Sequence, residues 1–401
     1  MLSSLLVNVG NYVYNLILGR LLGPEAFADA AVMVTFLLIL SFIAMTFQLT
    51  VARFIAEVEE DKQSAVYRMI NNWSLRFGIT VGILVMAFAK NLQTIFHTSS
   101  SEMFMIFGAS LPLYFIMSTN RGNFQGRQEL YKLSYTYQGE MIARLSISLL
   151  LIYLLNWEAS ILIAIGIAVS FLIGLFPYHK NKSLNTLNAP YTPNSPCPLN
   201  LRKSIMHFLL ITALYEGTQI IINNSDILLV KHYFPSYDAG LYAALALIGR
   251  AVYFVTWMFV MILLPKVVEA HKNGLPHASL LYSNLKSIGI LCLTIVLGCF
   301  LFPKLAVSIL FGEAYLDVAY LLGPYAVATS LFALANVFVY YSLSLSKYKP
   351  VFLASVFGIL QVSGIIFLHD SLLQVVLVQI GLMSIHLCLQ VIYFLRSQIN
   401  R

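Results

Sequence analysis

Charge is the scarcest property of this 401-residue chain. Only 10% of its residues are Asp, Glu, Lys or Arg, whereas 59% are hydrophobic, and its mean hydropathy is +0.80. A soluble domain carries about 25% charged and about 45–50% apolar residues. A water-exposed surface of this size needs more charge, which excludes a cytosolic enzyme, a nucleic-acid-binding protein and a disordered scaffold. The composition indicates a polytopic membrane protein.

Motifs for nucleotide hydrolysis and for metal or redox chemistry are also absent. The sequence has no GxxxxGK[ST] loop, no HExxH and no CxxC pair. We therefore expect no enzymatic activity, no cofactor and no bound metal. Cysteines number only four, and Cys292, Cys299 and Cys388 lie in apolar runs, so we interpret these three as reduced packing residues.

Long apolar runs are abundant. A helix of about 20 mostly apolar residues spans the hydrocarbon core, and lipid offers the backbone no other partners. The alternating pattern of a membrane β-barrel is absent. We predict an all-α polytopic membrane protein with about twelve transmembrane helices. The predicted spans are 2–19, 30–52, 73–89, 103–119, 138–155, 159–177, 205–224, 239–264, 283–303, 318–343, 350–368 and 372–395.

Lys and Arg are distributed unevenly over the predicted loops. With the N-terminus in the cytoplasm, 18 of the 24 basic residues fall on the cytoplasmic side, and Arg144 and Arg250 fall within helices. The remaining four are Arg20, Lys90, Lys231 and Lys304. The positive-inside rule then predicts that both termini are cytoplasmic. The net charge of +7 is explained as a topology signal.

A polar, proline-containing segment divides the chain near its midpoint. We predict an N-terminal lobe of six helices at 1–177, a cytoplasmic linker at 178–203 and a C-terminal lobe of six helices at 204–401. The halves carry similar residues at an offset of about 213, such as Arg53 and Lys266. Because six is even, we expect two parallel repeats with a transport cavity between them.

Polar side chains form one helical face at the start of each predicted lobe. The stripes are Asn8, Asn11 and Asn15 in the first helix and Glu216, Gln219 and Asn223 in the seventh. The asparagines have two open interpretations, since they could line the cavity or join helices by hydrogen bonds. For Glu216 we favour the cavity, because a carboxylate is a costly way to join helices in lipid.

Further charges lie inside predicted spans. Glu140 and Arg144 are spaced i, i+4, which fits either a self-satisfied ion pair or an arginine that meets an anionic substrate. Arg250 has no acid one turn away, so its partner must come from another helix or from the substrate. Our hypothesis for that partner is Glu216.

Charges near helix ends have a plainer interpretation. Arg53, Arg121 and Lys266 obey the positive-inside rule, and they could also receive phosphate at a cytoplasmic entrance. Arg20 and Lys231 are expected to snorkel to the outer interface. Asp226 is expected to be a solvated helix terminus.

Three segments, 17–57, 121–147 and 226–271, resemble the polysaccharide flippases of the multidrug, oligosaccharidyl-lipid and polysaccharide exporter superfamily. The motifs that carry the likeness are Arg20 to Glu25, Gln125-Gly126, Glu140 with Arg144, Asp238-Ala239-Gly240 with Tyr242, Arg250 and Pro265. One departure is that Ala28 and Asp29 follow Phe27, where the family usually carries a glycine.

The resemblance implies a MATE-like transporter with two pseudo-twofold lobes. It implies that undecaprenyl-diphosphate-linked oligosaccharide repeat units move from the cytoplasmic to the outer leaflet of the bacterial inner membrane by alternating access. Such transport feeds O-antigen, capsule or exopolysaccharide assembly. The expected partners are this lipid-linked substrate, membrane lipids, and a polysaccharide polymerase with glycosyltransferases, and the transporter is expected to act as a monomer. The coupling ion, H⁺ or Na⁺, and the identity of the sugars stay open.

Other functions are weighed against this one. A cation-coupled multidrug exporter usually carries a carboxylate in the first helix, where this chain has Asn8, Asn11 and Asn15. A flippase for the peptidoglycan lipid precursor commonly has two further helices after the twelfth, whereas this sequence stops at Arg401. A membrane glycosyltransferase is expected to have a larger loop than the predicted linker.

Overall fold

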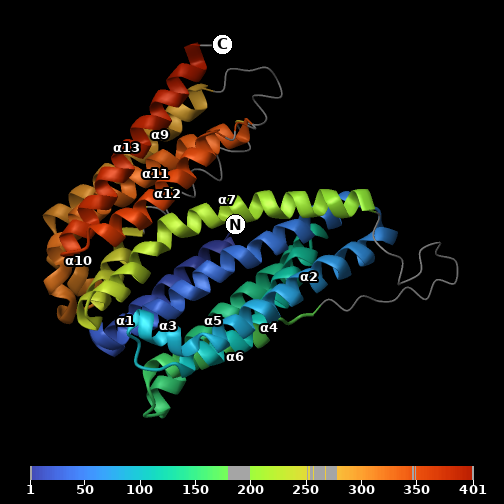
Figure 1. Ribbon diagram of the computed structural model, residues 1–401, viewed down its shortest axis with the longest axis horizontal. Coiled ribbons are helices and arrows are strands. Elements are labelled where there is room, and N and C mark those ends of the chain that lie inside the picture. Colours follow the sequence, from blue (N-terminus) through green and yellow to red (C-terminus); the bar gives the residue numbers. More distant parts are fainter. Residues whose placement is uncertain are drawn as a thin grey trace. The chain divides into compact units, whose positions relative to one another are not determined.

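The protein is helical, with no strand in any described residue (Figure 1). The computed structural model describes residues 2–178, 199–250, 252, 256, 267, 278–345, 347 and 349–399. The all-α prediction is confirmed. The helices are α1 (Leu2–Glu57), α2 (Glu60–Ala87), α3 (Ala89–Phe96), α4 (Glu102–Gly126), α5 (Leu130–Leu154), α6 (Ala159–Gly174), α7 (Leu199–Tyr233), α9 (Ala278–Leu301), α10 (Pro303–Leu310), the 3₁₀ helix η1 (Glu313–Leu321), α11 (Leu322–Ser344), α12 (Lys349–Phe367) and α13 (Leu372–Ile399).

The chain forms two compact units, residues 1–18 with 29–220 and residues 19–28 with 221–401. In the first unit, α4 packs against α2 and α6, and α5 packs against α6 (Figure 1). In the second, α11 packs against α9 and α13, and α13 packs against α12. Residues 179–198 of the predicted linker lie outside the described residues, and its last residues form the start of α7.

Helix α1 joins the first two predicted spans without a loop. It is broken at Gly23, whose φ of 71° and ψ of 172° lie outside the helical region. Glycine tolerates positive φ, and the residue before a proline, here Pro24, is disfavoured in the helical conformation. The Gly-Pro pair therefore ends one helical segment and starts the next.

The short segment around this break belongs to the second unit. Arg20 donates from Nε to the carbonyl of Leu310 at 3.1 Å and from Nη2 to those of Ser308, at 3.1 Å, and Ile309. These are the last carbonyls of α10, where a helix has no donors of its own and favours a cation. The hydroxyl of Tyr315 also donates to the carbonyl of Gly19 at 2.7 Å. Arg20 is exposed and its guanidinium caps α10, and its position at the outer interface stays a prediction.

Each unit contains one eight-residue helix after a long one. Helix α3 follows α2 with a bend of 63°, and α10 follows α9. Lys90 and Lys304 are the second residues of the two short helices and are 214 residues apart. This offset is close to that of the sequence repeat.

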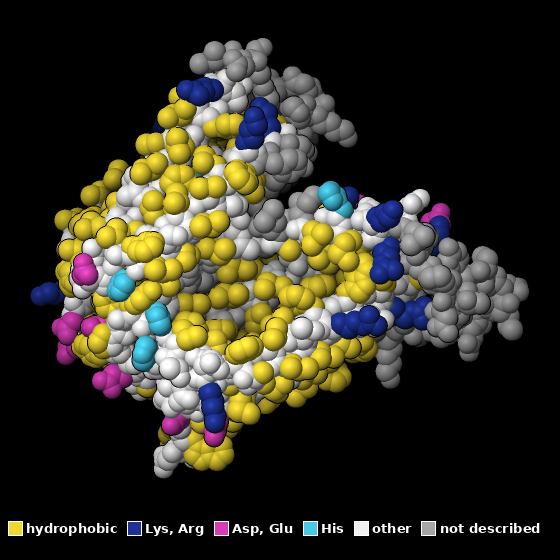
Figure 2. Space-filling view, in the orientation of Figure 1, with side chains coloured by type: hydrophobic (Ala, Val, Ile, Leu, Met, Phe, Trp, Pro, Cys, Tyr) yellow, Lys and Arg dark blue, Asp and Glu magenta, His cyan; other side chains and the backbone are white. Residues whose placement is uncertain are grey.

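Several helices are long and apolar enough to cross a membrane. Within the described residues six helices meet this test alone, and the bent pair of α2 and α3 adds a seventh if it is one span. Only 17% of the most apolar window of α9 is buried, and Ile290, Leu293 and Leu297 are each about half exposed. Such side chains need lipid around them, and hydrophobic side chains cover much of the face seen in Figure 2. The protein is a multi-pass membrane protein. The count of about twelve crossings stays a prediction.

Gly240 offers a test of the packing in the second unit. A Cβ atom at this position would overlap the carbonyl oxygen of Pro24, a backbone atom that cannot rotate away. We expect Gly240→Ala to lower the free energy of unfolding by about 1–3 kcal/mol. Gly298→Ala is the control, because nothing lies within 4 Å of its Cβ position and alanine favours helices. Thermal unfolding in detergent compares the two, and equal stability of both variants would contradict the close approach.

Candidate functional site

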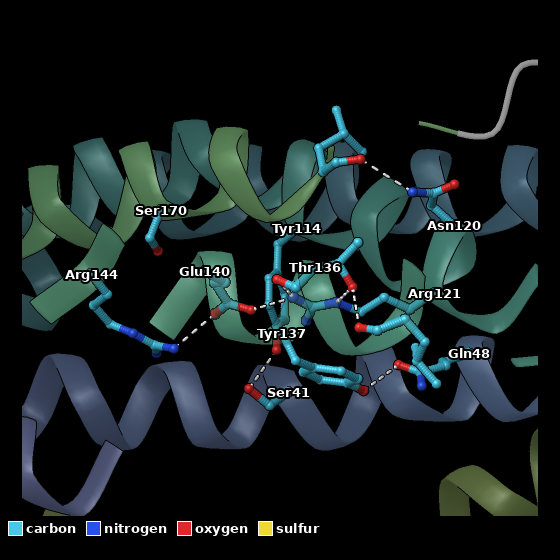
Figure 3. A network of polar contacts seen from close by, with 12 residues as sticks. Ser41, Gln48, Tyr114, Asn120, Arg121, Thr136, Tyr137, Glu140, Arg144 and Ser170 are labelled. Carbon is cyan, nitrogen blue, oxygen red and sulfur yellow. Dashed lines mark hydrogen bonds and ion pairs between the residues drawn. The ribbon is translucent and has the colours of Figure 1, made fainter. Parts of the chain in front are cut away.

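A buried carboxylate joins two arginines in the first unit (Figure 3). Oε2 of Glu140 lies 2.8 Å from Nη2 of Arg121, and Oε1 lies 2.9 Å from Nη2 of Arg144. All three residues are at least nine-tenths buried. The i, i+4 pair expected on α5 is present, and α4 adds a second arginine to it. We call these three residues the Glu140 cluster.

The guanidinium of Arg121 contacts Thr136 and Tyr137 in addition to Glu140. Its Nε donates to Oγ1 of Thr136 at 3.2 Å and its Nη2 to the Thr136 carbonyl at 2.8 Å. Its guanidinium lies 3.9 Å from the ring centroid of Tyr137, a favourable cation–π distance. The hydroxyl of Tyr137 donates to Gln48 (Figure 3). The Gln48 amide in turn donates to Gln125. Arg121 is thus a buried structural cation inside the unit, and its role at a cytoplasmic entrance stays a prediction.

Arg144 has hydrogen-bonding capacity left over. Its Nε is buried and has no hydrogen-bond partner, while its Nη2 contacts Glu140. Because two guanidinium groups share one carboxylate, the Glu140 cluster carries a formal charge of +1. A buried, unsatisfied donor costs free energy, so an incoming acceptor would be bound favourably. Arginine suits a phosphate because its planar fork can donate two parallel hydrogen bonds.

A second buried charge network lies in the second unit. Oδ1 of Asp226 on α7 lies 3.1 Å from Nη2 of Arg250, and Oδ2 accepts the hydroxyls of Tyr242 at 3.1 Å and Tyr325 at 2.8 Å. Gln379 on α13 donates to the Tyr242 hydroxyl at 2.7 Å. The Asp226 network is electrically neutral, and its carboxylate accepts three charge-assisted or hydroxyl hydrogen bonds.

A small cavity adjoins this network. Its volume is about 20 Å³, and its polar lining consists of Asn223, Arg250, Tyr325, Thr329, Gln361 and Gln379. A water molecule needs roughly 10–15 Å³, whereas ligand pockets reach about 300 Å³ or more. The cavity fits ordered water and excludes a sugar ring.

Three expectations about this region are wrong. Asp226 is buried, because α7 continues to Tyr233, nine residues beyond the predicted span. It is the ion-pair partner of Arg250, for which Glu216 was our hypothesis; the Glu216 side chain lies outside the described residues. Lys231 is also buried, with Nζ donating to Ser236 at 2.8 Å, because the chain reverses just after α7.

The three asparagines of the stripe on α1 become less exposed from Asn8 to Asn15. Asn8 is exposed, Asn11 is half-buried, and Asn15 is buried. Nδ2 of Asn15 donates to the Asn11 carbonyl at 2.8 Å, and Oδ1 of Asn15 is buried without a hydrogen-bond partner. The contact within α1 leaves both interpretations of the stripe open.

The remaining predicted residues are dispersed. Gln219 is buried and Asn223 is half-buried on α7, and both have polar or ring contacts. Arg53 is exposed near the end of α1, pairs with Glu57 at 2.8 Å, and lies 4.5 Å from the Phe208 ring centroid. Lys266 lies outside the described residues.

Sequence comparison identifies the family. Residues 17–320 match the profile of the family described as polysaccharide biosynthesis protein. The chain belongs to the polysaccharide biosynthesis protein family. No curated protein sequence matches it.

Solved structures share the fold of this polysaccharide biosynthesis protein. An inward-facing MATE multidrug resistance transporter of the MOP superfamily matches with a TM-score of 0.79 at 14% identity, over 98% of this chain and 94% of that one. The lipid II flippase MurJ in an inward closed conformation matches with 0.75 at 14% identity, over 99% and 86%. The eukaryotic MATE transporter AtDTX14 matches with 0.63 at 14% identity, over 96% and 91%. The predicted MATE-like transporter fold is confirmed.

Proposed function

We propose that this protein is a flippase for undecaprenyl-diphosphate-linked oligosaccharide repeat units. It would move them from the cytoplasmic to the outer leaflet of the bacterial inner membrane, for O-antigen, capsule or exopolysaccharide assembly. The observation that carries the proposal is the Glu140 cluster, a buried group with a formal charge of +1 and a free arginine donor, in a polysaccharide biosynthesis protein with a transporter fold.

The chemistry of this cargo matches the polar groups available. A diphosphate brings negative charge and acceptor oxygens that suit Arg144. The sugars bring hydroxyl groups that asparagine and glutamine amides can bind, and Asn8, Asn11 and Asn15 lie on the same unit as the Glu140 cluster. The prenyl chain needs only lipid. Transport by alternating access would carry the polar part past these groups while the tail stays in the bilayer.

The setting follows from this function. We place both termini in the cytoplasm, on the charge asymmetry of the predicted loops. Glycosyltransferases would supply the lipid-linked repeat unit and a polymerase would consume it. A single chain would be sufficient for transport.

Two other cargoes have some support. The likeness to MATE multidrug transporters favours an exporter of drugs, and the likeness to MurJ favours a peptidoglycan lipid precursor. A drug exporter has no need of a buried cluster with excess positive charge. The two lipid-linked cargoes share a prenyl diphosphate, so their sugars must distinguish them.

Substitution of Arg144 tests the proposal. Arg144→Ala leaves Glu140 paired with Arg121, so we expect the protein to insert and fold while the cluster becomes neutral. A charge-assisted hydrogen bond contributes about 1.5–3 kcal/mol, so transport should fall by roughly tenfold or more. Arg144→Lys should also be impaired, because an ammonium lacks the planar fork.

The readout is surface glycan in cells that lack the native gene and carry each variant at equal protein level. Lys132→Ala is the control, because this lysine pairs with Glu129 in a half-exposed ion pair at 2.8 Å. Wild-type glycan with Arg144→Ala would remove Arg144 from the substrate path. Normal glycan after deletion of the gene would reject the proposed cargo altogether.

A further inference from the structure

A buried histidine lies between α12 and α13, apart from both charged networks. His386 is fully buried and stacks on Phe357, with ring centroids 5.0 Å apart and an interplanar angle of 21°. Its Nε2 lies 3.1 Å from Nε2 of Gln390, and this amide nitrogen also lies 3.0 Å from the carbonyl oxygen of Pro350. Nδ1 of His386 and Oε1 of Gln390 are buried without hydrogen-bond partners.

The Pro350 carbonyl fixes the proton positions in this group. A carbonyl only accepts, so the NH₂ side of the Gln390 amide must face it. The same NH₂ group faces His386, and an amide nitrogen cannot accept a hydrogen bond. Nε2 of His386 must therefore carry the lone pair, and the neutral ring holds its hydrogen on Nδ1.

We propose that Nε2 of His386 is a proton-binding site whose occupancy controls a contact between α12 and α13. A proton taken up from water at Nε2 would point at the Gln390 NH₂ group. Two hydrogen-bond donors would then face each other, which is repulsive. The amide must then turn so that Oε1 accepts the new N–H. This turn breaks the hydrogen bond to Pro350 at the start of α12.

Two features of the group favour this exchange. Oε1 of Gln390 has no partner in the neutral arrangement, so the turn replaces the neutral hydrogen bond to Pro350 by a charge-assisted one from the imidazolium to Oε1. The face of Phe357 would stabilise an imidazolium stacked on it by a cation–π interaction.

The charges around His386 are few. Helices α11 and α12 pack against α13. Their ionisable side chains are Tyr325, Tyr340 and Tyr341 on α11 and Lys349 on α12, and α13 itself adds Cys388, Tyr393 and Arg396. No carboxylate lies on these three helices, and in the described part of the chain His386 forms no ion pair. A bound proton would thus be held without a fixed counter-charge, which suits release when the packing of α12 changes.

The link to transport rests on the proposed function, for which this site would bind the coupling ion. The proton site itself requires no cargo, so it is tested on the purified full-length protein in nanodiscs. Histidine ¹⁵N NMR between pH 7.5 and pH 4 reports the tautomer and protonation of each ring. Hydrogen exchange of residues 349–354, corrected for the intrinsic effect of pH, reports the start of α12.

We expect the His386 signal, assigned by its loss in His386→Gln, to show a bare Nε2 at pH 7.5 and an imidazolium at low pH. Exchange at the start of α12 should rise several-fold over the same range in the wild type and lose this pH dependence in His386→Gln. Gln390→Glu should shift the protonation midpoint upward, because a carboxylate accepts the Nε2 hydrogen. The histidine signal whose midpoint moves in Gln390→Glu is then that of His386, so this variant assigns and tests the site even if His386→Gln fails to fold.

His207→Gln is the matched control, because His207 is an exposed histidine, and it should change neither readout. A hydrogen on Nε2 at pH 7.5, or a neutral ring throughout the titration, would overturn the proposal. Unchanged pH-dependent exchange in His386→Gln would also overturn it. The NMR and hydrogen-exchange readouts do not depend on glycan transport. The proton site and the proposed flippase function can therefore be rejected independently of each other.

Discussion

Replacing Glu140 by glutamine should destabilise the protein more than the loss of any exposed charge. The substitution keeps the shape of the side chain but leaves Arg121 and Arg144 buried without a counter-charge. Removing one partner of a buried ion pair typically costs about 3–5 kcal/mol, because the remaining charge stays desolvated. We expect a loss of this size for Glu140→Gln.

The measurement is thermal unfolding of purified protein in one detergent at one protein concentration. Glu129→Gln is the control, because Glu129 pairs with Lys132 at a similar distance of 2.8 Å but is substantially exposed. An exposed pair contributes about 0–1 kcal/mol. If both variants unfold together near the wild-type temperature, the Glu140 cluster does not hold α4 and α5 as described.

Asp226→Asn is expected to have a comparable effect in the second unit. Asp226 accepts from Arg250, Tyr242 and Tyr325, and asparagine would place an NH₂ group against at least one of these donors. The guanidinium of Arg250 would also lose its buried counter-charge. The expected destabilisation is again about 3–5 kcal/mol.

An exposed aspartate and a double variant complete this test. Asp317 accepts one hydrogen bond, from Tyr237 at 2.9 Å on the surface, so Asp317→Asn should be nearly neutral. Adding Arg250→Gln to Asp226→Asn removes both charges and should recover part of the lost stability. A double variant no more stable than Asp226→Asn would show that the ion pair is not the source of the effect.

Periodicity and hydropathy predicted most of the helices, because lipid leaves the backbone little choice. They did not predict that the two helical segments of α1 would meet at Gly23 without a loop between them, since a Gly-Pro pair usually marks a turn or loop. The end of α7 was placed too early because Asn223, Asn224 and Asp226 interrupt the apolar run. Burial of Asn224 and Asp226, which bind Arg250, permits the helix to continue to Tyr233.

The sequence predicted the charged contacts within one helix but not those between helices. Spacing alone found Glu140 with Arg144, since i, i+4 residues meet on any helix. Arg121 comes from α4, and it contacts Thr136 because the two residues are nearly equidistant from the turn at Gln128. That symmetry was a usable signal. The pairing of Asp226 with Arg250 joins separate helices, and no local spacing reports it.

The central claim is that this protein moves a prenyl-diphosphate-linked oligosaccharide across a bilayer. The direct test is reconstitution of the purified chain into liposomes with the lipid-linked glycan that accumulates when its gene is deleted. A membrane-impermeant glycosidase or lectin then reports how much glycan reaches the outer leaflet with time. We predict that the wild-type protein exposes the inner pool of glycan rapidly. With Arg144→Ala the rate of exposure should be lower by roughly tenfold or more, because a charge-assisted hydrogen bond to the substrate is lost. Exposure no faster than in protein-free liposomes would contradict the account.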